Sequence, residues 1–222
     1  MALAWPDDLQ AWRAVRKSIR WATASEPIDE SAVEFRDGVV RFVDGVVRAR
    51  DPLRAERLLA ALAQVRADAC AGLDLSFELL AHWQRIVLGV TTPVAFRLAP
   101  AFAKRGREHY GLDAQVQQRF RACLAESRTR GIPLAARGAR LYLDVCFFHP
   151  FSDGNGRAAM LAFYHLLASD GVFVDQAAPL LVVSRRADDR ARALALAKLV
   201  TVLITATRRR AESSRHLWAE QH

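Results

Sequence analysis

Apolar residues recur at three- and four-residue spacing along most of the chain, which is the pattern of amphipathic helices. The first set follows the typical helix start Pro6-Asp7-Asp8 and consists of Leu9, Trp12, Val15 and Ile19. The same period predicts further helices over residues 30–48, 52–65, 76–88, 114–128, 134–148, 154–169 and 188–218. The pattern therefore favours an all-α fold.

One stretch departs from the helical pattern. Residues 89–113 contain two prolines and three glycines, and apolar positions there follow no sustained period. We expect a loop in this stretch, with a short hairpin around Val94 to Leu98. A helical bundle with one irregular excursion is the predicted architecture.

The length of 222 residues suits one domain with a full core, alone or with a helical appendage. We find no long uncharged apolar run and no secretory pattern at the N-terminus, so neither a membrane span nor export is expected. Cys70, Cys123 and Cys146 are odd in number and widely spaced. They predict buried free thiols in a reducing cytoplasm rather than disulfides or structural zinc.

The formal net charge is +8, and most of the basic residues are arginines scattered among acidic ones. The dense run is Arg208-Arg209-Arg210, and no aromatic residues alternate with it. We therefore do not expect nucleic acid as a partner. A phosphate-bearing small ligand or an acidic partner protein explains the positive charge equally well.

Residues 149–157 read His-Pro-Phe-Ser-Asp-Gly-Asn-Gly-Arg and concentrate several reactive groups. Pro150 disfavours a helical conformation at His149, so the imidazole is expected at the mouth of a turn. The ordinary pKa of histidine lies near neutrality, which lets His149 accept a proton from an alcohol. Phe151 is apolar in a polar loop and is expected to anchor that loop in the core.

The second half of this run is suited to phosphate. Gly154, Asn155 and Gly156 stand at the start of a predicted helix, where backbone N–H groups can converge on an anion. Asp153 can hold Mg²⁺, and Arg157 can bind phosphate with two donors. A tight corner between two helices explains each residue singly but not the whole set in this order. The set predicts transfer of a phosphate-containing group to a hydroxyl.

The run resembles the signature of the Fic (Fido) family, written HPFx[DE]GNGRxxR. The matching residues are His149, Pro150, Phe151, Asp153, Gly154, Asn155, Gly156 and Arg157. The resemblance extends over about residues 75–195, with residues 1–74 as a helical segment packed on this core and residues 196–222 as a C-terminal helix. It implies a Fic-type helical bundle with a short flap or hairpin before the active-site loop.

The resemblance also implies an activity: transfer of AMP from ATP to a Ser, Thr or Tyr hydroxyl of a target protein by a toxin-like bacterial enzyme. His149 would then be the general base and Asp153 the Mg²⁺ ligand. The backbone of Gly154, Asn155 and Gly156 would form the anion hole, and Arg157 would hold the outer phosphates of ATP. The flap that clamps the target segment would lie at residues 91–98 and include Val94, Ala95, Phe96 and Arg97.

The chain departs from the family pattern at one position, where Met160 replaces the last arginine. We also find no inhibitory [ST]xxxE[GN] motif, since Ser31-Ala32-Val33-Glu34 has the wrong spacing. Without that arginine, the nucleotide would bind through Arg157 alone or in another orientation, or the donor would be a different molecule. Packing in the core explains a methionine at position 160 equally well. The alternatives are a Doc-like phosphotransferase, transfer to a small-molecule hydroxyl and a non-catalytic nucleotide-binding adaptor. In place of such a motif, a separate antitoxin protein could inhibit the enzyme.

Overall fold

In the computed structural model, the described part of the chain is residues 6–28 and 36–219, with side chains to residue 214. Two long helices, α6 (Leu134–Phe148) and α7 (Asn155–Ser169), pack against each other at its centre. Nearly all of their residues are buried, which explains why both read as strongly apolar. The corner between them is the loop with the candidate chemistry.

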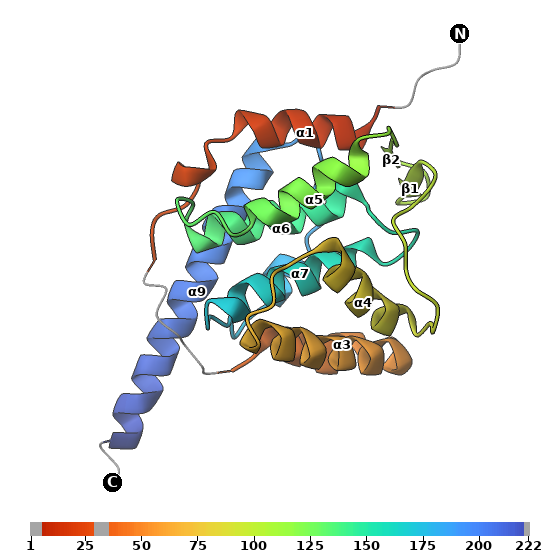
Figure 1. The fold of residues 1–222 in the computed structure, drawn as a ribbon. Helices are drawn as coiled ribbons and strands as arrows, with labels where there is room; N and C mark the ends of the chain where they lie inside the picture. The colour runs from red at the N-terminus through yellow and green to blue at the C-terminus, as the bar shows by residue number, and fades with distance from the viewer. Residues whose placement is uncertain (1–5, 29–35, 220–222) are drawn as a thin grey trace.

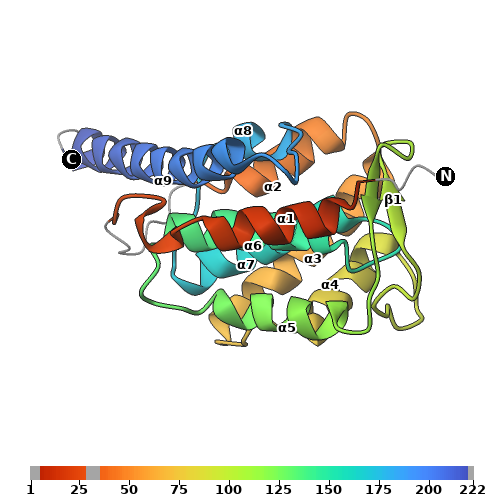
Figure 2. The ribbon, with the colours of Figure 1, turned by 90° about the horizontal axis from the view of Figure 1, so that it is seen from above.

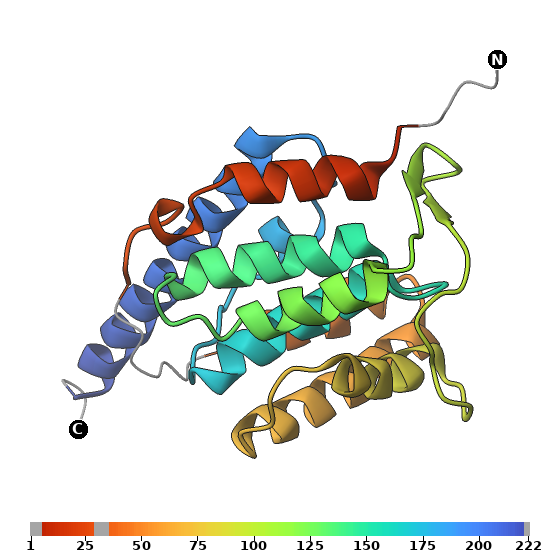
Figure 3. The same ribbon diagram turned by 45° about the horizontal axis from the view of Figure 1, so that its top comes forward.

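The other helices surround this central pair (Figures 1 and 3). On one side α3 (Pro52–Cys70) and α4 (Phe77–Leu88) pack on α7. On the other, α1 (Asp8–Ser18), α5 (Val116–Glu126) and the long α9 (Arg190–Ala219) pack on α6. Shorter elements are the 3-10 turn η1 (Trp21–Thr23), α2 (Gly38–Phe42), the π-turn η2 (Val43–Val47) and α8 (Ala178–Leu181). The all-α prediction is confirmed.

The predicted helix boundaries hold best where capping residues mark them. Residues 134–148 form α6 as predicted, and α4 begins after Ser76, whose hydroxyl accepts the N–H of Leu79 at 3.1 Å. The helix predicted over residues 30–48 is helical from Gly38 to Val47, but the prediction is wrong at residues 36–37, which precede the helix. Asp37 caps it, accepting from the N–H groups of Val39 and Val40. Residues 30–35 lie outside the described residues.

The predicted hairpin around Val94 to Leu98 is wrong in position. The antiparallel strands are β1 (Ala101–Ala103) and β2 (Glu108–Tyr110), with Ala101 opposite Tyr110. Figure 2 shows them beyond one end of the helical bundle. Residues 94–97 cannot form a free ribbon, because Phe96 packs between Phe77 and Phe120 and the Arg97 side chain is buried.

All three cysteines are free, but the prediction that all are buried is wrong for one of them. Cys123 is buried and Cys146 half-buried, whereas Cys70 is exposed at the last position of α3. Within the described residues, none of the helices has the length and apolar character needed to cross a membrane.

A buried carboxylate connects α1 to the core. Asp144 on α6 is fully buried and accepts two bonds from Arg16, at 2.7 Å from Nε and 3.1 Å from Nη2. The indole N–H of Trp12 donates to the same carboxylate at 2.9 Å. A buried carboxylate is tolerated only with such partners. This network therefore fixes α1 against α6.

We expect Arg16→Met to destabilise the protein by about 3 kcal/mol, because it leaves the Asp144 carboxylate buried without its bidentate partner. Denaturant unfolding followed by circular dichroism measures this loss. Lys17→Met on the exposed side of the same helix is the matched control and should change stability by less than about 0.5 kcal/mol. Equal stabilities of the two variants would contradict this role of Arg16.

Candidate active site

The loop between α6 and α7 is closed by one side chain. The Asn155 amide is buried, accepting the N–H of Phe151 at 2.9 Å and donating to its carbonyl at 2.8 Å. The Phe151 ring is also buried and stacks on Phe77, with centroids 5.6 Å apart. Phe151 is thus buried beneath the loop, against α4. Left-handed conformations at His149 (φ 50°) and Gly154 (φ 76°) turn the chain on either side of Phe151.

The His149 side chain is held in an orientation that suits a base. Its Nδ1 lies 3.1 Å from the carbonyl oxygen of Cys146, and because that oxygen can only accept, Nδ1 carries the proton. Nε2 then keeps its lone pair. Burial lowers the pKa of His149, outweighing the bond to Cys146, and the charge of Arg97 lowers the pKa further. The imidazole is therefore neutral at neutral pH.

Tyr110 is a second determinant of this orientation that sequence reasoning missed. Its ring stacks on His149, with centroids 4.3 Å apart and planes 10° from parallel. The Tyr110 hydroxyl donates to Glu108 at 2.7 Å, and the N–H of His109 donates to Asp8 at 2.8 Å. The start of α1 thereby holds β2 against the site. No sequence pattern marks Tyr110, because a three-residue strand carries no detectable period.

Arg97 was predicted to belong to a flap. Its side chain connects the irregular segment of residues 89–113 to the loop between α6 and α7. Its guanidinium donates to the carbonyls of His149 at 2.9 Å, Ala99 at 2.7 Å and Gly111 at 2.6 Å. Its backbone N–H donates to Pro150 at 2.9 Å. Val94 is half-buried and Ala95 exposed, so residues 94–97 form an anchored segment. Whether they contact a target protein stays a prediction.

The start of α7 offers donors to an anion. The backbone N–H groups of Asn155 and Gly156 make no hydrogen bond within the described part of the chain. They stand at the N-terminus of a 15-residue helix, where the helix dipole favours negative charge. Asp153 accepts from the Gly154 N–H at 2.6 Å and pairs with Arg157 at 3.0 Å. The expected anion hole and its two charged neighbours are thus adjacent.

A Mg²⁺ ion at Asp153 would need phosphate oxygens as further ligands. Among the described residues, no cluster of three or more His, Cys, Asp or Glu side chains could hold a metal by itself. The Asp153 side chain is 74% exposed, which leaves it accessible to a hydrated ion. Magnesium commonly binds through one or two carboxylates together with substrate phosphates. The residues present fit that mode.

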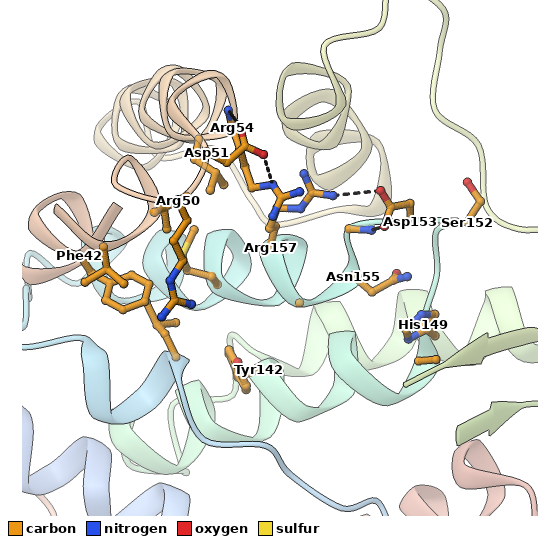
Figure 4. A pocket seen from close by; sticks show the side chains of 18 of the residues that line it. Phe42, Arg50, Asp51, Arg54, Tyr142, His149, Ser152, Asp153, Asn155 and Arg157 are labelled. Atoms are coloured by element: carbon orange, nitrogen blue, oxygen red, sulfur yellow. Dashed lines mark hydrogen bonds and ion pairs between the residues drawn. The ribbon is translucent and has the colours of Figure 1, made fainter. Parts of the chain in front are cut away.

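A pocket of about 670 Å³ opens in front of the loop (Figure 4). His149 and residues 152–157 form one wall. The opposite wall comes from the end of α2, from η2 and the turn after it, and from the start of α3, and it consists of Phe42, Val46, Val47, Arg50, Asp51, Arg54 and Leu58. This volume lies in the range of ligand sites. Sequence reasoning missed Arg50 and Arg54, because charged residues near the start of a helix are usually solvent-exposed and nothing in the sequence marks these two as pocket residues.

Met160 both packs in the core and lines the pocket. It is 5% exposed and belongs to the buried apolar cluster. Its thioether gives α7 an apolar surface one turn after Arg157, at the position where the family pattern has an arginine. Besides Arg157, the pocket is lined by two arginines from the other wall, Arg54 of α3 and Arg50 of the turn before it.

Residues 74–167 match the model of the Fic/DOC family, to which the resemblance of the motif pointed. A search of curated protein sequences finds no match.

Solved structures with a similar fold are also Fic proteins. A histidine-to-alanine variant of IbpA Fic2 in complex with adenylylated Cdc42 has 12% identity and a TM-score of 0.55, with 87% of this chain and 69% of that chain covered. IbpA Fic2 tethered covalently to Cdc42 has 13% identity and a TM-score of 0.55, with 89% of this chain and 70% of that chain covered. Fic-1 from C. elegans has 15% identity and a TM-score of 0.50, with 97% of this chain and 73% of that chain covered. These likenesses establish the fold.

We expect Gly154→Ala to destabilise the protein by about 1–3 kcal/mol, because a side chain is strained at positive φ. The new methyl group would also clash with Nε2 of Gln84, a buried amide that donates to the Asp153 carbonyl at 2.7 Å. Thermal unfolding measures the loss. Gly156→Ala is the control, since its Cβ would meet no atom within 4 Å, and it should not destabilise. Equal losses in both variants would contradict the argument.

Proposed function

We propose that the protein transfers AMP from ATP to a Ser, Thr or Tyr hydroxyl of a target protein. The observation that carries this proposal is the arrangement of a neutral imidazole and two helix N–H donors around one pocket, with Nε2 and both N–H groups lacking a partner among the described residues. A fold of this kind in complex with adenylylated Cdc42 supports the choice of AMP as the transferred group.

In the proposed reaction, Nε2 of His149 takes the proton of the target hydroxyl. The hydroxyl oxygen then forms a bond to the α-phosphorus, the bond between that phosphorus and its bridging oxygen to the β-phosphate breaks, and pyrophosphate leaves. The N–H groups of Asn155 and Gly156 would stabilise the charge on the phosphate oxygens. Arg157 would bind the outer phosphates.

Asp153 would hold Mg²⁺, which neutralises phosphate charge when bound. The ion would compete with Arg157 for the Asp153 carboxylate, since the two side chains pair at 3.0 Å. Binding of a metal–nucleotide complex would therefore free the Arg157 guanidinium to contact phosphate.

The hairpin β1–β2 is the proposed contact for the target segment, in place of residues 91–98. It borders the pocket, and Phe102 is 59% exposed while lining it. Short strands of this kind can accept an extended segment by backbone pairing. Such a segment would pass close to His149, since Tyr110 of β2 stacks on that ring.

Labelled ATP tests which group is transferred. After incubation with Mg²⁺ and a cell lysate, we expect target protein to retain label from the α-phosphate and none from the γ-phosphate. His149→Ala should abolish labelling but bind ATP within about twofold of the wild type, because the base acts on the hydroxyl. His82→Ala, an exposed histidine on α4, is the control and should label normally.

Other results would identify other functions. Retention of γ label alone would indicate a Doc-like phosphotransferase. Label in a small molecule would indicate a small-molecule acceptor, and ATP binding without transfer would indicate an adaptor. Full labelling by His149→Ala would contradict the proposed base.

The pKa of His149 provides a second test. Burial lowers it, so the ring should titrate below the ordinary value of 6.5. Since only the neutral imidazole accepts a proton, label transfer should persist below pH 6.5 and fall as pH drops through the lowered pKa. Tyr110→Ala should raise this pKa toward 6.5 by exposing the ring, whereas Tyr110→Phe should preserve the stack and the pKa. Proton NMR of the His149 ring measures both; a wild-type pKa at or above 6.5 would contradict the prediction.

A further inference from the structure

Three arginine side chains line the pocket from two opposite walls. Arg157 comes from α7, within the segment that matches the Fic/DOC family. Arg50 lies just before α3 and Arg54 in its first turn, both outside that segment. Figure 4 shows Arg54 and Arg157 directed into the space between α3 and α7. The pocket is therefore cationic on the side that faces the active-site loop.

Arg54 is oriented while most of its donors stay free. The Asp51 carboxylate caps α3 by accepting the Arg54 N–H at 3.0 Å, and it also contacts the Arg54 Nε at 3.3 Å. This contact uses the inner nitrogen, and both terminal nitrogens of the guanidinium have no partner among residues 6–28 and 36–219. Terminal nitrogens are the ones that bind phosphate in a two-pronged manner.

Arg50 differs from a neighbouring arginine that has acidic partners. The Arg50 side chain makes no ion pair or hydrogen bond within the described part of the chain, although it lines the pocket. Arg48, two residues earlier, lies 2.8 Å from Asp44 and 3.9 Å from Glu56, and it does not line the pocket. The two arginines have similar positions along the chain, but only Arg50 offers a free charge to a ligand.

The charge of the pocket favours a polyanion. Three guanidinium groups face the carboxylates of Asp51 and Asp153, which leaves an excess of positive charge. Any cation bound at Asp153 would increase that excess. A monoanion needs one such partner, whereas a triphosphate carries enough charge to use several of them.

We propose that Arg54 and Arg157 hold the outer phosphates of the nucleotide donor between α3 and α7, with Arg50 adding a further positive charge. This inference rests on the proposed function for the identity of the donor, but its anion site is defined by the pocket itself. It makes α3 a determinant of specificity for a nucleoside triphosphate over a monophosphate.

Isothermal titration calorimetry with Mg²⁺ tests this inference, using ATP, AMP and inorganic tripolyphosphate as ligands. We expect Arg54→Ala to weaken binding of ATP and tripolyphosphate at least tenfold and binding of AMP less than twofold. Arg50→Ala should weaken the binding of ATP several-fold. Arg48→Ala is the matched control and should bind all three ligands as the wild type does. The Arg54 side chain is 55% exposed and its ion pair with Asp51 lies at the surface, so thermal unfolding should be almost unchanged.

The outcomes separate this inference from the proposed function. Unchanged ATP and tripolyphosphate binding by Arg54→Ala, or equal losses for ATP and AMP, would overturn the phosphate site even if AMP transfer is observed. Loss of tripolyphosphate binding in Arg54→Ala would support the site even if no AMP is transferred. The phosphate site would also be overturned if the wild-type protein bound neither ATP nor tripolyphosphate.

Discussion

The site depends on the two hydrogen bonds between the Asn155 amide and the backbone of Phe151. Both groups are buried, and a buried unpaired N–H or carbonyl costs about 1–3 kcal/mol, so this amide keeps the corner closed. Closure fixes His149 at the end of α6 and the free N–H groups at the start of α7 relative to each other. In the proposed reaction Asn155 would therefore act on the phosphate through its backbone N–H, because its side chain is bonded to Phe151.

The geometry of this corner also depends on distant parts of the chain. Arg97 donates to carbonyls at the end of α6, and Tyr110 stacks on His149. Asp8 at the start of α1 holds the strand of Tyr110, and the buried Arg16–Asp144 pair holds α1 on α6. The orientation of one imidazole thus depends on tertiary contacts with α1 and with residues 97–110, and such contacts make the position of the ring rigid.

The sequence determines the central helices and the loop chemistry directly, because burial on nearly all sides makes residues 134–148 and 154–169 strongly apolar and the motif is local. The hairpin could not be located in this way. Its strands are three residues long, and β2 and the residue after it are held by hydrogen bonds to Asp8 and Asp7, about a hundred residues earlier. Nor does the sequence distinguish Arg50 from Arg48, since only the fold shows which of them faces the pocket.

The pairing of Arg157 with Asp153 raises the question of whether the site is locked. Asp153 lies in the loop before α7 and its side chain is 74% exposed, and exposed ion pairs contribute about 0.2–1 kcal/mol. Hydrogen bonds from an arginine to phosphate contribute about 1.5–3 kcal/mol, so a nucleotide would separate this pair readily. The pair therefore orients Arg157 without inhibiting it.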